Sequence, residues 1–185
     1  MLTNLREAIR PYVEGLGKAC GVLLPYPTAW TTFGLAFSVL AGYYFYLGSV
    51  QQAGLFVLLS GLMDVLDGAV ARAVDKVSPS GAFLDSNIDR LSEVSLFVGI
   101  LWSGLVGPTL VLLTLSFSLL VSYSRARAEG LGLKAEGVGI GERAERLLAL
   151  AIAGLVGQLY WGVLIVLALA SLTFVQRVYI YSSRL

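Results

Sequence analysis

Three long stretches of the chain contain no charged residue, and they constrain its fold more than any other feature. They cover residues 19–63, 94–124 and 147–176. A segment that crosses a bilayer needs about 20 apolar residues, and it forms a helix because lipid cannot hydrogen-bond to an open backbone. Only 14% of the residues are charged, whereas a soluble domain averages about 25%. We therefore expect an all-α integral membrane protein.

Turn-forming residues divide these stretches into three predicted helical hairpins. Glycines mark the outer turns, at 48–51, 104–108 and 154–162. The six expected transmembrane helices cover residues 29–48, 52–73, 81–103, 107–128, 143–158 and 160–180. A chain of 185 residues has the length of one domain. We therefore predict a single membrane domain over residues 1–185, with the six-helix bundle at 29–180.

The basic residues predict the orientation of this bundle. All 13 Lys and Arg residues fall on the side that holds both termini, and the positive-inside rule makes that side cytoplasmic. We expect a multi-pass protein of the cell (plasma) membrane of a prokaryote, with both termini in the cytoplasm. The net charge of +1 gives no reason to expect a nucleic-acid partner.

The first 20 residues have the pattern of an amphipathic helix. Charged residues interrupt the segment, so it lacks the apolar core of a signal peptide. Its apolar residues recur at helical spacing, and they are Leu2, Leu5, Ile9, Val13 and Leu16. We predict a juxtamembrane helix on the membrane surface, bent at Pro11. The alternative is a solvated tail.

Four aspartates near the cytoplasmic ends of two spans form the candidate catalytic site. Asp64 and Asp67 are three residues apart and Asp85 and Asp89 four apart, so each pair shares one helix face. A short turn at 78–80 would bring the two faces together. Histidine is absent and Cys20 is the sole cysteine, so any metal site is lined by oxygen.

Four converging carboxylates repel one another unless cations neutralise them. Oxygen ligands favour Mg²⁺, with Mn²⁺ as a second possibility, and four carboxylates can hold two ions about 4 Å apart. The alternative is that the aspartates only form ion pairs, with Arg72, Lys76 and Arg90 as their partners.

The segment that contains the aspartates resembles a known signature. From Asp64 to Asp89 it reads D-x2-D-G-x2-A-R-x8-G-x3-D-x3-D, which is similar to the motif of the CDP-alcohol phosphotransferases. The resemblance implies six transmembrane helices, usually a homodimer, and attack of an alcohol on the lipid-side phosphorus of a CDP-lipid, with CMP as the leaving group.

The resemblance also implies a role for each residue of the motif. All four aspartates would bind metal, and Asp89 would also be the catalytic base. Residues that would contact the CDP-lipid are Asp67, Gly68, Ala71, Arg72 and Gly81. Family members commonly carry Pro-Asn-x-x-Thr at the first span, whereas this chain has Thr28 in place of Asn. Thr31 stays a candidate nucleotide contact, and the alternative for both threonines is a helix cap.

A second basic cluster at 125–146 is the only clue to the acceptor alcohol. Its arginines could bind an acceptor phosphate, or they could be basic only because inner loops are basic. The stretches S-Y-S-R-A-R-A-E and E-R-A-E-R resemble those of the phosphatidylinositol phosphate and archaetidylinositol phosphate synthases. That resemblance implies inositol 1-phosphate as the acceptor, with its phosphate held by Arg125, Arg146 and Arg177. Ala144, where bacterial members often have Pro, favours the archaeal branch.

Other functions are compatible with parts of this pattern. Glycerol 3-phosphate would be an equally phosphorylated acceptor, whereas serine would leave the arginines unexplained. A divalent-cation transporter would also place carboxylates inside a helix bundle, but no polar residues continue the path outward. The pattern does not distinguish CDP-archaeol from CDP-diacylglycerol, because grooves between helices accept either kind of chain.

Overall fold

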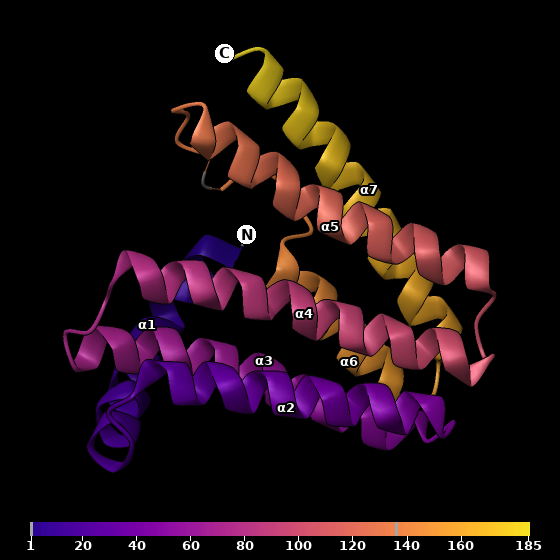
Figure 1. Ribbon diagram of the computed structural model, residues 1–185, viewed down its shortest axis with the longest axis horizontal. Coiled ribbons are helices and arrows are strands. Elements are labelled where there is room, and N and C mark those ends of the chain that lie inside the picture. The colour runs from indigo at the N-terminus through magenta and orange to yellow at the C-terminus, as the bar shows by residue number, and fades with distance from the viewer. Residues whose placement is uncertain (1, 136) are drawn as a thin grey trace.

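The computed structural model describes the backbone of residues 2–135 and 137–185, and the side chains from Pro11 onward. Within these ranges the chain forms seven helices and no strand (Figure 1). The helices are α1 (Leu2–Leu23), α2 (Pro27–Tyr46), α3 (Val50–Ala73), α4 (Pro79–Ser103), α5 (Pro108–Gly130), α6 (Arg143–Leu155) and α7 (Leu159–Ser182).

The predicted helical hairpins are confirmed as helices, because every predicted end lies within three residues of the observed one. Among the described residues, α3, α5 and α7 are long and apolar enough to cross a membrane. Helix α6 has 13 residues and is therefore about 20 Å long, which is shorter than a hydrocarbon core of about 30 Å. Length and composition thus support a membrane protein with three candidate spans.

Prolines and caps determine where the helices begin. Pro27, Pro79 and Pro108 each stand at the start of a helix, where a fixed φ is favourable and no amide donor is lost. The hydroxyl of Ser78 accepts a hydrogen bond from the amide of Gly81 at 3.1 Å and caps α4. Helix α4 ends at Gly104, whose φ of 68° is left-handed, a conformation that favours glycine.

Close contacts between small residues hold α2, α3, α4 and α6 together. Gly42 of α2 packs directly against the backbone of Gly99 of α4. A Cβ on Gly54 of α3 would lie 2.5 Å from the amide nitrogen of Leu155 at the end of α6. In lipid such close backbone approach is a main source of helix association. Figure 1 shows α2, α3 and α4 side by side, with α5 and α7 as a second pair above them.

The N-terminal segment is helical as predicted, and Pro11 lies inside α1. Gly17 faces α3, where a Cβ would lie 2.8 Å from Ala69. Leu16 is 53% exposed, so its apolar side chain points away from the bundle. The predicted apolar residues Leu2, Leu5 and Ile9 have side chains outside the described residues.

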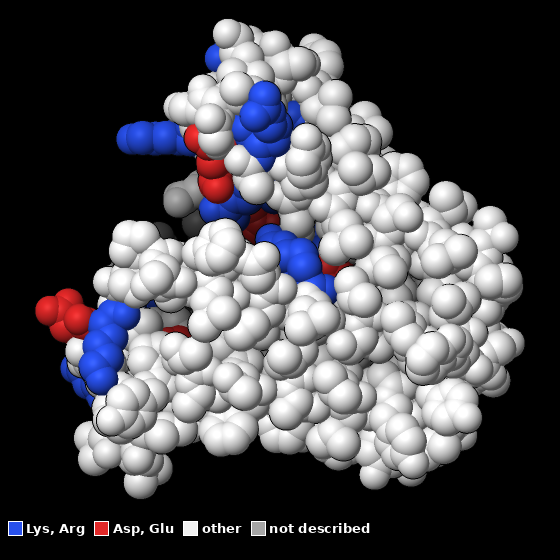
Figure 2. All heavy atoms as spheres, in the orientation of Figure 1, with Lys and Arg blue, Asp and Glu red and all other residues white. Residues whose placement is uncertain are grey.

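Charged residues are segregated along the molecule. In the face drawn in Figure 2, Lys, Arg, Asp and Glu gather at the end near the α3–α4 turn and in the hollow between α4 and the α5–α7 pair, whereas the opposite end is uncharged. Exposed aromatic side chains at that uncharged end include Tyr43, Tyr46, Trp102, Tyr160 and Trp161. This polarity is the one expected of a bundle with a single polar end in lipid.

Candidate active site

Three of the four predicted aspartates converge at the polar end of the bundle. Asp64 and Asp67 project from α3 and Asp85 from α4, and one carboxylate oxygen of each lies within 4.8 Å of the others. Within the described part of the chain, Asp67 Oδ2 and Asp85 Oδ1 are buried and have no hydrogen-bond partner. Buried acceptors without a partner are rare in proteins. Three carboxylates with two unsatisfied oxygens therefore fit the ligand set of a hard divalent cation such as Mg²⁺ or Mn²⁺.

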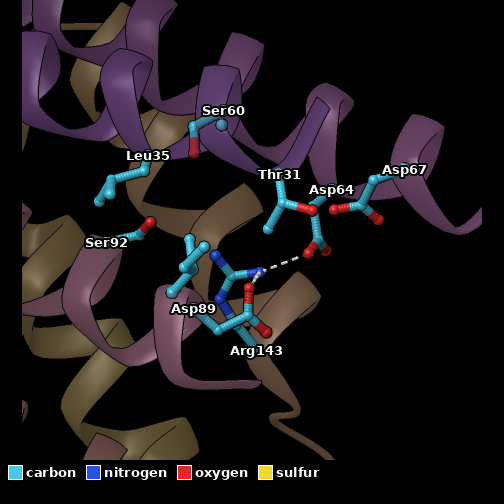
Figure 3. Close-up of a pocket in the computed structure, with 10 residues that line it drawn as sticks. Thr31, Leu35, Ser60, Asp64, Asp67, Asp89, Ser92 and Arg143 are labelled. Carbon is cyan, nitrogen blue, oxygen red and sulfur yellow. Dashed lines mark ion pairs between the residues drawn. The ribbon is translucent and has the colours of Figure 1, made fainter. Parts of the chain in front are cut away.

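The fourth aspartate is joined to this group by an arginine. Arg143 Nη1 lies 2.9 Å from Asp64 Oδ1 and 2.8 Å from Asp89 Oδ1, so one nitrogen bridges α3 and α4 (Figure 3). Arg143 was not predicted as a site residue. The available signal was the E-R-A-E-R stretch, which places Arg143 and Arg146 three residues apart, on one helix face.

The predicted ion pairs are found for only one of the three proposed partners. Arg90 Nη1 lies 3.5 Å from Asp89 Oδ2. Lys76 instead donates a hydrogen bond to the carbonyl of Pro25 at 2.9 Å. Arg72 makes no ion pair with the residues that the structure describes. The interpretation that the aspartates only form ion pairs with Arg72 and Lys76 is therefore wrong. Ion pairing also does not explain why Asp67 and Asp85 each have a buried oxygen without a partner.

A cavity of about 300 Å³ opens beside the aspartates. Its lining includes every residue predicted to contact the CDP-lipid, namely Thr31, Asp67, Gly68, Ala71, Arg72 and Gly81. Asp85 lines the same cavity, so the space is continuous with the carboxylate group. Pockets of this size hold small organic ligands. A side chain at Gly81 would narrow it, because a Cβ there would lie 3.1 Å from Ser78 Oγ.

The helix-cap interpretation of Thr28 and Thr31 is wrong. Tyr26 is the N-cap of α2, and no side chain caps this end. The hydroxyl of Thr31 donates to the carbonyl of Pro27 at 3.3 Å, one turn earlier in the same helix. Both threonines line the cavity.

The three predicted acceptor arginines lie outside that cavity, and each has protein partners. Arg125 pairs with Glu129 at 2.8 Å on the surface of α5. Arg146, only 1% exposed, pairs with the buried Glu93 of α4 at 2.9 Å and donates to Gly141. Arg177 donates to the carbonyls of Val138 at 2.8 Å and Val121 at 2.6 Å. Arg146 and Arg177 thus meet at segment 138–142.

Comparison of the sequence with known families identifies the class of protein to which this chain belongs. The sequence profile of the CDP-alcohol phosphatidyltransferase family matches residues 24–176. The chain belongs to this family. The family and the enzyme class predicted from the aspartate motif are therefore confirmed, and the transporter alternative is set aside.

Particular relatives narrow the comparison. The archaetidylinositol phosphate synthase of Pyrococcus horikoshii is 43% identical over 185 residues, which cover 100% of this chain and 98% of the relative. The enzyme of the same name from Methanothermobacter thermautotrophicus is 38% identical, with 96% of this chain and 92% of the relative covered.

Among solved structures, the Mycobacterium tuberculosis phosphatidylinositol phosphate synthase with CDP-DAG bound superposes with a TM-score of 0.79 at 28% identity, covering 91% of this chain and 92% of that one. The same enzyme in complex with manganese and citrate gives a TM-score of 0.77 at 30% identity, covering 92% and 87%.

Proposed function

We propose that this enzyme transfers the phospholipid moiety of a CDP-lipid, CDP-archaeol or CDP-diacylglycerol, to inositol 1-phosphate and releases CMP. The observation that carries the proposal is the single cavity that holds all six predicted CDP-lipid residues and ends at the aspartate group. The names of the relatives at 43% and 38% identity support inositol phosphate as the acceptor and an archaeal lipid as the product.

The metal part of the proposal is two Mg²⁺ ions, replaceable by Mn²⁺, held by Asp64, Asp67, Asp85 and Asp89. It is supported by the orphaned oxygens of Asp67 and Asp85 and by manganese in the mycobacterial relative. Bound divalent ions would supply positive charge to the diphosphate and to the departing CMP.

The side chains around the cavity position the CDP-lipid. Arg72 is exposed at the cavity wall, and its planar guanidinium can bind two phosphate oxygens at once. Gly68, Ala71 and Gly81 leave space for the cytidine diphosphate, and Thr31 offers a hydroxyl beside Asp67. The lipid-side phosphorus would then lie near the carboxylates of α3 and α4.

Asp89 is the proposed general base of the transfer. A carboxylate oxygen of Asp89 takes the proton from the acceptor hydroxyl while the hydroxyl oxygen forms a bond to the lipid-side phosphorus. The bond between that phosphorus and the bridging oxygen breaks, and CMP leaves with the oxygen. Asp89 is partly buried, with its side chain 16% exposed, so a substrate hydroxyl would displace little water to reach it.

The acceptor phosphate is proposed to bind Arg125, Arg146 and Arg177. The support is that Arg146 and Arg177 converge on segment 138–142. Both are nearly fully buried, at 1% and 3% exposed. Binding a phosphate directly would require each to exchange a present partner for the anion.

The proposed setting is the plasma membrane of a prokaryote. The single domain, residues 1–185, would cross it six times, with α1 on the surface and with both termini and the active site in the cytoplasm. The segregation of charge to one end of the bundle supports this orientation (Figure 2). A homodimer is proposed from the family resemblance alone.

The first test is CMP release by purified protein with Mg²⁺ and a CDP-lipid. Inositol 1-phosphate, glycerol 3-phosphate, free inositol and serine are compared as acceptors. We expect release with inositol 1-phosphate only. Release with glycerol 3-phosphate instead would be consistent with the proposed metal site but would contradict the proposed acceptor.

A further inference from the structure

Arg143 contacts two carboxylates that are also proposed to bind metal. Its Nη1 contacts one oxygen of Asp64 and one of Asp89, at 2.9 and 2.8 Å. Both carboxylates are proposed metal ligands. A carboxylate oxygen that binds a divalent ion lies about 2.0 to 2.6 Å from it. The guanidinium would therefore compete with a metal ion that used either of these oxygens as a ligand.

The guanidinium of Arg143 does not use all of its hydrogen-bond donors. Arg143 Nε is buried and has no hydrogen-bond partner among the described residues, although a guanidinium carries five N–H donors. The side chain is 16% exposed and lines the narrow cavity that also contains Thr31, Asp67 and Ser92 (Figure 3). An unused donor is therefore present at the edge of the proposed reaction site.

The backbone of Arg143 is held in place, whereas its guanidinium group can reach other partners. Arg143 is the first residue of α6, and Arg146, one turn later, is fastened to Glu93 of α4 by a buried ion pair. The start of α6 therefore stays against α4. The long side chain of Arg143 can change partners by rotation about its own bonds, without movement of the helix.

We propose that Arg143 exchanges partners when metal binds. Before metal binds, it neutralises Asp64 and Asp89. When these carboxylates bind the metal instead, the guanidinium moves to the phosphate of the acceptor, which it can bind bidentately. This inference rests on the proposed function for the identity of the phosphate. Metal and the phosphorylated acceptor then bind cooperatively, and by linkage each raises the affinity for the other equally.

The experiment measures Mn²⁺ affinity by electron paramagnetic resonance on purified full-length protein, with and without inositol 1-phosphate. Arg143→Gln is compared with Arg90→Gln, which removes the same charge beside Asp89 but at 3.5 Å and from one carboxylate only. Without acceptor we expect Arg143→Gln to bind Mn²⁺ about 10-fold tighter than wild type, and Arg90→Gln less than about 3-fold tighter. In wild type, inositol 1-phosphate should tighten Mn²⁺ binding by about 5-fold or more, and Arg143→Gln should abolish this coupling.

Arg143→Lys is the second variant, because it keeps the charge but cannot form the planar fork. It should bind Mn²⁺ within about 3-fold of wild type and lose most of the coupling. Equal Mn²⁺ affinities of Arg143→Gln and Arg90→Gln, or coupling that survives in either Arg143 variant, would overturn the inference. The comparison without acceptor stands even if CMP release shows a different acceptor, so failure of the proposed function is seen separately.

Discussion

At the scale of single residues, two carboxylates of the polar end each have one oxygen without a partner among the described residues, beside arginines that have several partners. Asp67 and Asp85 each keep a buried oxygen unsatisfied among the described residues, whereas Arg146 donates to both Glu93 and Gly141. A buried acceptor without a partner costs about 1 to 3 kcal/mol. The chain retains this cost at residues that are proposed to bind metal, while the ion pair of Arg146 with Glu93 joins α6 to α4.

Replacing the proposed base tests its role directly. Asp89→Asn keeps the size of the side chain but cannot accept a proton, so we expect CMP release to fall about 10²- to 10⁴-fold. Asp75→Asn is the matched control, because Asp75 matches no fixed position of the motif and has a φ of 53° that asparagine tolerates. Normal turnover of the Asp89 variant, measured as CMP release at saturating substrates, would rule out the base assignment.

Arg146 can be tested for a structural role as well as for phosphate binding. Its side chain and that of Glu93 are 1% and 3% exposed, and removing one partner of a buried pair costs about 3 to 5 kcal/mol. We expect Arg146→Ala to lower the free energy of unfolding by that amount, measured by denaturation in detergent. The double variant Arg146→Met with Glu93→Leu should recover most of the stability.

The acceptor KM of the double variant then separates the two roles. If stability returns but the KM for inositol 1-phosphate stays high, the guanidinium contributes to the phosphate site. A KM that returns to the wild-type value would restrict Arg146 to holding α6 against α4, and it would remove Arg146 from the proposed acceptor site.

At the scale of elements, close helix contacts set the distances across the site. Helix α2 carries Thr31 and α4 carries Asp85 and Asp89, and the two helices cross with Gly42 against Gly99. Helix α7 in turn holds the segment before α6. Thr173 accepts from the amide of Gly141 at 2.8 Å, and Tyr181 donates to the carbonyl of Ala135 at 2.7 Å. Arg177, between them on the same helix face, binds Val138, so α7 positions the start of α6 and with it Arg143.

The glycine crossing makes a prediction for α2 and α4. A Cβ at Gly99 would overlap the backbone of Gly42, and relieving that overlap must move two helices. We expect Gly99→Ala to cost about 1 to 3 kcal/mol of stability and to reduce CMP release by separating Thr31 from Asp85. Gly61→Ala in α3 is the control, since a Cβ there meets nothing within 4 Å. Equal stabilities of the two variants would show that α2 and α4 can move apart at this crossing without loss of stability.

At the scale of the whole molecule, the charge distribution determines how the bundle can sit in lipid. In the face drawn in Figure 2, charged side chains gather near the α3–α4 turn and in the hollow beside α4, and the opposite end is uncharged. Placing charged side chains in hydrocarbon would cost on the order of 3 kcal/mol each. Under the proposed function, the site would lie at the membrane edge, where a water-soluble acceptor could reach it and the lipid chains of a CDP-lipid could stay in the bilayer.

Cysteine labelling tests this orientation. In a Cys20→Ala background, which has no other cysteine, Gln51→Cys marks the start of α3 and Ser80→Cys the start of α4. Both positions are exposed. We expect a membrane-impermeant maleimide to label Gln51→Cys in intact cells and Ser80→Cys only after the cells are opened. The reverse pattern would place the active site outside the cytoplasm.

Local sequence patterns were enough to predict the helices and the aspartate motif. Uncharged stretches with turn residues between them predict helical hairpins because backbone groups in lipid must bond within their own segment. The spacing of Asp64 and Asp67 places both on one face of α3, and the turn to α4 brings Asp85 to within reach. Each of these relations connects residues that are close in sequence or joined by one short turn.

Only the tertiary structure decided the partners that come from distant segments. Arg143 lies far along the chain from both Asp64 and Asp89, and Arg146 is 53 residues from Glu93. No spacing rule relates such residues, because their meeting depends on how α6 packs against α3 and on how α3 and α4 both pack against α2. The sequence alone determined the helices and the set of carboxylates, while packing between helices decided which arginine neutralises them.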